Sequence, residues 1–250
     1  MKIGQEFFIR NALDPIGTAT MSPAMREAER YARYLYDCVK TWLMPPILEV
    51  GAGYGTYTRY LINHGPVIAT DIDAGLLSAL ESNFSERDVV VRHLDLNDAD
   101  EITSFAEHAP RSVFCCNVIE HIADDVGMLR ALHQATEVEG YLCLIAPAHP
   151  HLYGYLDEQA GHYRRYSRTT LAQTMTDAGW QVVTTFHVNA LGAIGWWCNH
   201  RLLPSRSLDH PRINNQLWLY DRCLVPLARL TDPFFSRFLG LSVIGIGKKS

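Results

Sequence analysis

Short β-rich runs alternate with segments of helical periodicity from residue 46 onward, and this alternation constrains the fold more than any other feature. It is typical of a parallel sheet whose two faces are covered by helices. The predicted strands are Pro46–Val50, Pro66–Thr70, Asp88–His93, Arg111–Asn117, Tyr141–Ala146, Gln181–Val188 and Leu241–Gly247. The predicted helices are Pro23–Trp42, Thr56–His64, Ala74–Phe84, Asp98–His108, Asp124–Thr136 and Arg168–Ala178. We therefore expect an α/β fold with one seven-stranded sheet.

The sixth and seventh predicted strands are separated by about fifty residues, which is too long for an ordinary loop. This segment, Asn189–Gly240, combines helical stretches with four prolines, so it should be an inserted helical subdomain. We expect one domain formed by residues 1–188 and 241–250. Residues 189–240 would then form a lid, an acceptor-binding subdomain or an interaction subdomain.

The composition is that of a globular protein, because 48% of the 250 residues are apolar and 20% are charged. A net charge of −5 excludes a generally basic nucleic-acid binder. The six cysteines include no C-x-x-C pair, which favours buried, reduced thiols over a disulfide framework. The charge is uneven: residues 1–150 carry 11 basic and 21 acidic side chains (11 − 21 = −10), and residues 151–250 carry 11 and 6 (11 − 6 = +5).

Two features predict a cytoplasmic protein. The first ten residues mix Lys2, Glu6 and Arg10 with apolar residues, so they do not resemble a signal peptide. The apolar stretch Leu191–Cys198 is far shorter than the ~20 residues of a membrane-spanning helix.

A glycine-rich turn follows the first predicted strand in the segment EVGAGYGTYTRYL, residues 49–61. Glycines at 51, 53 and 55 allow the backbone to approach a ligand closely and present free amide groups to it. A dinucleotide-binding turn has G-x-G-x-x-G spacing, whereas the third glycine here arrives one residue early and position 56 is Thr56. The spacing therefore argues against a pyrophosphate site. A tight turn with no ligand is the structural alternative.

Carboxylates follow the second and third predicted strands. Asp71 lies about twenty residues after the first glycine, where a carboxylate can accept hydrogen bonds from both ribose hydroxyls. Asp73 is better explained as the cap of the next helix. Asp95 could accept from an adenine amino group while Leu96 packs against the ring; the alternative is a solvated loop aspartate.

These segments together resemble the class I S-adenosylmethionine-dependent methyltransferases. The segments ILEVGAGYGTYTRYL, VIATDID, RHLDLND and FCCNVIEHIADD stand in that family's order and spacing over residues 46–188, and the similarity resumes at the last strand. The segment at 152–171, LYGYLDEQAGHYRRYSRTTL, resembles a type 11/12 subgroup, many of whose members act in glycan, lipid or natural-product pathways. The resemblance implies a Rossmann-like sheet that is mostly parallel, with an antiparallel last strand, and S-adenosylmethionine as cofactor.

The resemblance also implies the roles of individual residues in cofactor binding. Glu49 and the turn formed by Gly51, Ala52, Gly53 and Gly55 should face the methionine moiety, and Asp71 should hold the ribose. Ile72 and Leu96 should enclose the adenine, whose amino group should contact Asp95. Asn117 and Val118 should close the pocket beside the sulfonium.

Candidates for acid–base chemistry follow the fourth and fifth predicted strands. His121 could be a general base or could shape the pocket. His162 or Tyr163 could take a proton from the acceptor, with Arg165 meeting an anionic group. In the alternative interpretation, HYRRYS only caps the helix beginning near Ser167, and its arginines form surface ion pairs.

A metal site is not predicted. His149, His151 and His162 could suggest one, but two histidines spaced i, i+2 in a proline-bounded loop are a weak signal. No cysteine or aspartate spacing strengthens it.

Three functions compete on these observations. The favoured one is methyl transfer from S-adenosylmethionine to a small-molecule or lipid/glycan-pathway acceptor. A non-catalytic cofactor-binding adaptor is the second, and an NAD(P)-dependent oxidoreductase, disfavoured by the glycine spacing, is the third. The sequence does not name the acceptor or the methylated atom.

The insertion interleaves aromatic residues with arginines on an otherwise acidic chain. Such a segment could lie against an anionic membrane or roof a lipid-like acceptor. It could equally form a lid over a soluble acceptor or the interface of a homodimer.

Overall fold

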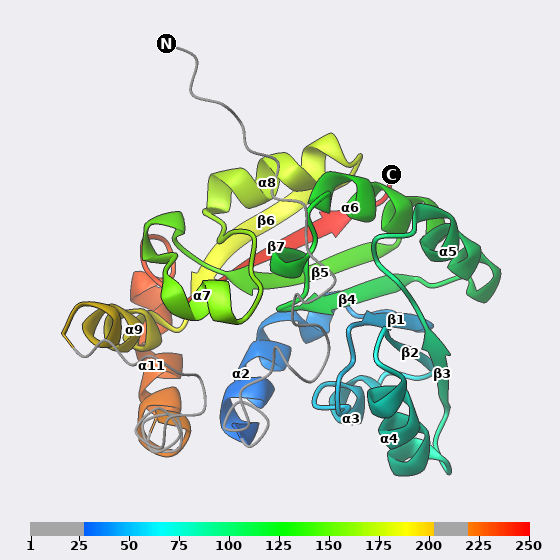
Figure 1. Cartoon of the computed structure of the whole chain (residues 1–250), viewed down its shortest axis with the longest axis horizontal. Coiled ribbons are helices and arrows are strands. Elements are labelled where there is room, and N and C mark those ends of the chain that lie inside the picture. Colours follow the sequence, from blue (N-terminus) through cyan, green and yellow to red (C-terminus); the bar gives the residue numbers. More distant parts are fainter. Residues whose placement is uncertain (1–27, 203–219) are drawn as a thin grey trace.

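A computed structural model describes residues 28–202 and 220–250 of the chain. Within these residues lies one seven-stranded sheet with the strand order β3-β2-β1-β4-β5-β7-β6 (Figure 1). The strands are β1 (Ile47–Val50), β2 (Val67–Asp71), β3 (Val89–His93), β4 (Ser112–Cys116), β5 (Tyr141–Pro147), β6 (Gln181–Val188) and β7 (Ser242–Lys248). All seven predicted strands are confirmed, and no strand end differs from its predicted position by more than one residue.

The first five strands are parallel, and β7 runs antiparallel between β5 and β6. The antiparallel last strand is the one the sequence predicted. The carboxyl ends of β1, β2, β3 and β4 consequently meet at one edge of the sheet, which is where sheets of this kind bind ligands in a crevice.

Helices cover both faces of the sheet (Figure 1). One face packs against α2 (Glu29–Val39), α3 (Thr58–Leu61) and α4 (Ala74–Phe84), and the other packs against α5 (Ala99–Ser104), α6 (Asp125–Ala135) and α8 (Arg168–Asp177). The described parts of the insertion are α9 (Ala190–Leu202), the π-helical turn η6 (Tyr220–Leu224) and α11 (Val225–Phe235). Short helical segments complete the connections: η2 (Lys40–Trp42), η3 (Phe105–His108), η4 (Ile119–His121), η5 (Pro150–Leu152) and α7 (Tyr155–Gln159).

The helix starts follow from capping side chains. Asp73 accepts hydrogen bonds from the backbone of Gly75 and Leu76, so its predicted capping role is confirmed. Ser167 caps α8 through the backbone N–H of Thr170.

The predicted helix Thr56–His64 is shorter than expected, because its two ends are turns around the four residues of α3. The predicted start of the first helix at Pro23 lies outside the described residues.

The insertion is held to the sheet and to α2 by two buried aspartates. Asp232 of α11 accepts hydrogen bonds from the hydroxyl of Tyr34 and from the backbone N–H groups of Asn189 and Ala190. Asp221 accepts from the backbone N–H of Tyr31 over 2.8 Å, close to the start of α2. These contacts join α9, α11 and α2 at one end of the sheet (Figure 1).

Among the described helices, none is long and apolar enough to cross a membrane.

Candidate active site

The glycine turn after β1 has backbone angles that favour glycine at three positions. Gly51, Gly53 and Gly55 have φ values of +67°, +58° and +81°. A Cβ on Gly51 would lie 2.5 Å from a methyl carbon of Val118, and a Cβ on Gly55 would lie 2.4 Å from the ring of Phe84. Gly55, expected at the cofactor, is therefore required for packing against α4. Gly51 brings the turn against the loop after β4.

Asp71 braces the same turn from the end of β2. Its Oδ2 accepts a hydrogen bond from the N–H of Gly53 over 2.9 Å, and its Oδ1 accepts from the N–H of Asp73 over 3.0 Å. Each carboxylate oxygen has a second lone pair that a ribose hydroxyl can use. The carboxylate thus fixes the turn, and its contact with the ribose stays a prediction.

Glu49 is the most unusual group near the turn, because it is 1% exposed in the middle of the sheet. Its Oε2 accepts from the hydroxyl of Thr58 over 2.6 Å, whereas Oε1 has no hydrogen-bond partner among the described residues. Burial, together with the nearby charge of Asp71, raises the pKa of Glu49 to about 8. A buried carboxylate oxygen without a partner suits a ligand that brings a cation, such as the ammonium group of a methionine moiety.

The predicted adenine side of the pocket lies at the ends of β2 and β3. Leu96 is buried and Ile72 is half-buried. Asp95 accepts from the backbone and side chain of Asn97, and among the described residues both bonds use Oδ1. Its Oδ2 is thus the oxygen that could receive an adenine amino group.

The loop after β4 closes the crevice beside Gly51. Asn117 has a positive φ of 54°, and its N–H donates to the carbonyl of Ile145 on β5. This turn places Val118 against Gly51 and leads directly into η4, which carries Glu120 and His121. Asn117 and Val118, which were predicted to close the cofactor pocket, therefore lie between the glycine turn and η4.

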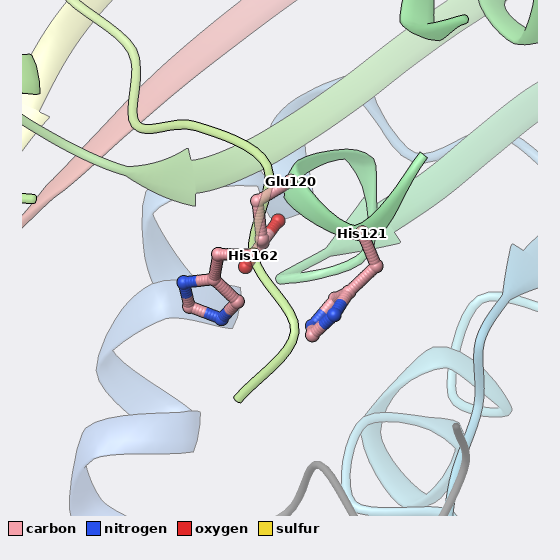
Figure 2. A group of neighbouring side chains, drawn as sticks. All are labelled: Glu120, His121 and His162. Carbon is pink, nitrogen blue, oxygen red and sulfur yellow. The ribbon is translucent and has the colours of Figure 1, made fainter. Parts of the chain in front are cut away.

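Glu120, His121 and His162 form a cluster beyond Val118 (Figure 2). The rings of His121 and His162 meet edge to face, with 4.7 Å between their centroids. Glu120 is fully buried, and neither of its carboxylate oxygens has a hydrogen-bond partner among the described residues. Burial raises the pKa of Glu120 to about 7, although the positive charges of His162 and Arg165 oppose the shift.

The loop after α7 brings His162 into this cluster. The backbone N–H of Tyr163 donates to the carbonyl oxygen of Glu120 over 2.7 Å, which ties the loop to η4. Tyr163 itself is half-buried beside the cluster. Of the three predicted acid–base residues, His121 and His162 thus belong to one group, and Tyr163 lies next to it.

Asp157 supports His162 from behind. Its Oδ1 lies 2.9 Å from Nδ1 of His162 and accepts from Nε of Arg165 over 2.8 Å. Burial alone would raise the pKa of Asp157, but the hydrogen bond with His162 and the charge of Arg165 hold that pKa below its ordinary value. Arg165 is also buried and lies over the ring of Trp196 on α9, 4.8 Å from its centroid.

These contacts revise the expected role of Arg165. The anion that it meets is Asp157 of the same chain rather than an acceptor group. Arg164 forms an ion pair with Asp125 over 2.7 Å, as the capping interpretation of HYRRYS predicted for these arginines. The segment therefore combines a structural part, Arg164 to Ser167, with His162 in the cluster.

The other two histidines that the sequence suggested for a metal site, His149 and His151, lie outside this cluster. His149 stacks on His187 with 4.7 Å between ring centroids, and His151 packs against His149. Burial lowers the pKa of His187 to about 4, and the neighbouring His149 adds to the shift. Sequence reasoning missed Glu120 and Asp157 as site residues, because only the fold reveals that these two carboxylates are buried beside His162.

Comparison with known proteins identifies the domain. A family model described as a methyltransferase domain matches residues 48–142. Among solved structures, a chain of the Haloferax volcanii complex that contains the Trm112 methyltransferase activator has a TM-score of 0.59 at 13% identity, covering 90% of this chain and 92% of that one. An S-adenosylmethionine-dependent methyltransferase from Archaeoglobus fulgidus has a TM-score of 0.58 at 16% identity, covering 90% and 94%.

A third similar structure was solved with a ligand. The trans-methyltransferase CalH in complex with SAH has a TM-score of 0.56 at 14% identity, and the match covers 90% of this chain and 59% of that one. No curated protein matches the sequence. At these identities the solved structures establish the fold, and the family match establishes a methyltransferase domain. Of the three functions that the sequence left open, these findings support methyl transfer.

Proposed function

Because the chain carries a class I S-adenosylmethionine-dependent methyltransferase domain, we propose that it methylates an acceptor presented at an anionic lipid surface. The observation that supports the proposal is the exposed apolar face of α11. This helix packs against α9, which in turn contacts the residues around the Glu120 cluster. The cofactor supplies an activated methyl group on a positively charged sulfur.

The chain's own residues fit this cofactor. The unpartnered oxygen of Glu49 suits the ammonium group, and the remaining lone pairs of Asp71 suit the ribose hydroxyls. Gly51 and Gly53 themselves add no side chains to the turn between these carboxylates. Each residue thus binds or orients one part of the cofactor.

The cluster beyond Val118 is where we place the acceptor. A hydroxyl or amine acceptor must lose a proton as the methyl group is transferred, so a group that holds that proton is needed near the reacting atom. His162 is the best-positioned residue, because Asp157 hydrogen-bonds to its Nδ1 and orients its ring. His121 faces it across the cluster (Figure 2).

A chain of contacts links this cluster to the insertion. Asp157 joins His162 to Arg165, and Arg165 lies over Trp196 of α9. Helix α9 packs in turn against α11. The helices of the insertion therefore neighbour the acceptor side of the crevice, where an acceptor held by a membrane would enter.

α11 and the turn after it carry large apolar side chains in contact with solvent. Leu230 and Phe234 of α11 are 71% and 80% exposed, and Phe238 of the turn is 74% exposed. Such a group is rare on a surface that meets only water. Exposed arginines at positions 222, 229 and 237 accompany it, which suits the negative charge of phospholipid headgroups.

A groove lies between α2 and the beginning of α11, with a volume of about 410 Å³. Arg30, Arg33 and Arg229 line it together with Glu29. Arg33 and Arg229 are both paired with Asp37, and the three guanidinium groups still leave the groove basic, which favours an anionic group such as a lipid phosphate. Apolar side chains and basic charge therefore occur together at this end of the molecule, which favours a lipid surface over a second copy of the chain.

The proposal is tested by incubating the protein with methyl-labelled S-adenosylmethionine and either a membrane-lipid extract or an aqueous metabolite extract. We expect the label to appear in the lipid fraction. Label that appears only in water-soluble products would contradict a lipid-held acceptor and leave methyl transfer itself intact.

A further inference from the structure

We propose that Glu120, His121 and His162 bind one divalent transition-metal ion of the zinc class. The three residues each offer a ligand atom, and these atoms all lie within 4.8 Å of one another. Figure 2 shows the two imidazole rings and the Glu120 carboxylate converging on one space. Two imidazoles and a carboxylate form a donor set that Zn²⁺ takes in proteins.

The state of Glu120 is the independent observation that favours an ion. Its carboxylate is fully buried, and both oxygens lack a hydrogen-bond partner among the described residues. A buried carboxylate is normally paired, hydrogen-bonded or coordinated to a metal. The nearby cation, Arg165, is already paired with Asp157, so the negative charge of Glu120 is not balanced by that guanidinium.

Asp157 prepares His162 for coordination. The Oδ1 atom of Asp157 lies 2.9 Å from Nδ1 of the His162 ring, which leaves Nε2 as the nitrogen that can face an ion. Histidines that bind metals characteristically use the other ring nitrogen for a hydrogen bond to a carboxylate or carbonyl. His162 and Asp157 already have this arrangement in the structure.

The backbone is also fixed where the ligands are attached. Glu120 and His121 lie on the same short helix, and the hydrogen bond from the N–H of Tyr163 to the carbonyl of Glu120 holds the loop of His162 against it. Bonds of about 2.0 to 2.2 Å to the ion require the three atoms to close by roughly 1 Å, which small side-chain rotations supply. An ion would therefore clip the loop after α7 to η4.

Three protein ligands leave at least one coordination position open, as in catalytic zinc sites. An acceptor hydroxyl bound there would have its pKa lowered by the ion, so the ion would take over a task otherwise assigned to His162 as base. This role rests on the proposed function. Metal binding itself does not, because it can be measured without an acceptor.

The test is calorimetric titration of the metal-free full chain with Zn²⁺, repeated with Co²⁺ to follow its visible absorption. We expect one ion per chain. Glu120→Gln, His121→Ala and His162→Ala should each weaken Zn²⁺ binding at least tenfold, and Asp157→Asn about tenfold through the orientation of His162. His108→Ala is the matched control, since this histidine lies on η3 outside the cluster, and it should bind as the wild type does.

Failure of Zn²⁺ binding by the wild type, or equal binding by the cluster variants and the wild type, would overturn the site. Melting curves show which variants are folded, and Glu120→Gln preserves the shape of the side chain. Methyl transfer that persists after chelation, with no bound ion, would overturn the ion's role in catalysis while leaving the proposed function in place.

Discussion

Asp71 accepts a hydrogen bond from the backbone N–H of Gly53 over 2.9 Å, so the carboxylate expected to hold the ribose also fixes the turn beside it. This double role links the shape of the glycine turn to ligand binding. A ligand that hydrogen-bonds to Asp71 meets a turn that the same carboxylate has already ordered.

Replacing Asp71 with alanine should weaken S-adenosylmethionine binding at least tenfold. Two charge-assisted hydrogen bonds to the ribose would be lost, each contributing about 1.5 to 3 kcal/mol. Asp71→Asn should bind better than the alanine variant, since its amide oxygen can still accept from Gly53. Calorimetry measures both affinities, and an unchanged affinity in a folded Asp71→Ala protein would remove Asp71 from the cofactor site.

The affinity for S-adenosylhomocysteine should rise as the pH increases from about 6 to about 8. Burial gives Glu49 a pKa of about 8 in the free protein, so the group is mostly protonated at lower pH. A bound ammonium group favours the carboxylate, and binding therefore releases a proton. Titrations in two buffers with different ionisation enthalpies measure that release. Glu49→Gln should bind more weakly and lose the pH dependence; an identical pH profile in this variant would refute the assignment.

The same shift predicts how the stability of the ligand-free protein changes with pH. The unfolded Glu49 loses its proton near its ordinary value of 4.5, and the folded group loses it near 8. Between these values the folded state binds more protons, so the free energy of unfolding falls as the pH rises. Urea denaturation of the wild type and Glu49→Gln across this range isolates the contribution, which should vanish in the variant.

His162→Ala should lower turnover by about 10² while leaving cofactor affinity nearly unchanged, because the ring acts on the acceptor side of the crevice. Asp157→Asn should lower turnover less, since it removes only the partner that orients His162. Tyr163→Phe tests the remaining candidate. Full turnover with the true acceptor in both His162→Ala and Tyr163→Phe would make this loop structural.

The exposed face of α11 should attach the protein to anionic liposomes at low salt. Attachment should weaken as the Debye length shrinks from ~10 Å at 0.1 M to ~3 Å at 1 M ionic strength. Phe234→Ser combined with Phe238→Ser should reduce co-sedimentation, because both side chains are mostly exposed and their loss leaves the fold intact. A wild type that stays in the supernatant at low salt and sediments as a dimer in ultracentrifugation would identify the face as a dimer contact.

The sheet was predictable from sequence because strand and helix periods differ and the alternation is regular. Gln181–Val188 was predicted with the ends that the structure has, since its apolar residues are bounded by turn signals. The helix after the glycine turn was predicted too long. Its apolar pattern continues past α3, whereas the backbone leaves the helix at Ile62 and turns toward Gly65.

The two sides of the site differ in how far the sequence could predict them. The residues after β1, β2, β3 and β4 had to meet, since parallel neighbouring strands end at one edge. The network of Asp157 with His162 and Arg165 depends on the path of an irregular loop. No periodicity indicates that Arg165 turns inward while Arg164 stays at the surface.

Calorimetric titration with S-adenosylhomocysteine and with NADH tests most directly the claim that the crevice formed by Glu49, Gly51 and Asp71 is an S-adenosylmethionine site. We predict one bound S-adenosylhomocysteine per chain, no heat of binding with NADH, and loss of the signal in the double variant Glu49→Gln, Asp71→Ala. Binding of NADH without S-adenosylhomocysteine, or a double variant that binds as tightly as the wild type, would contradict the account.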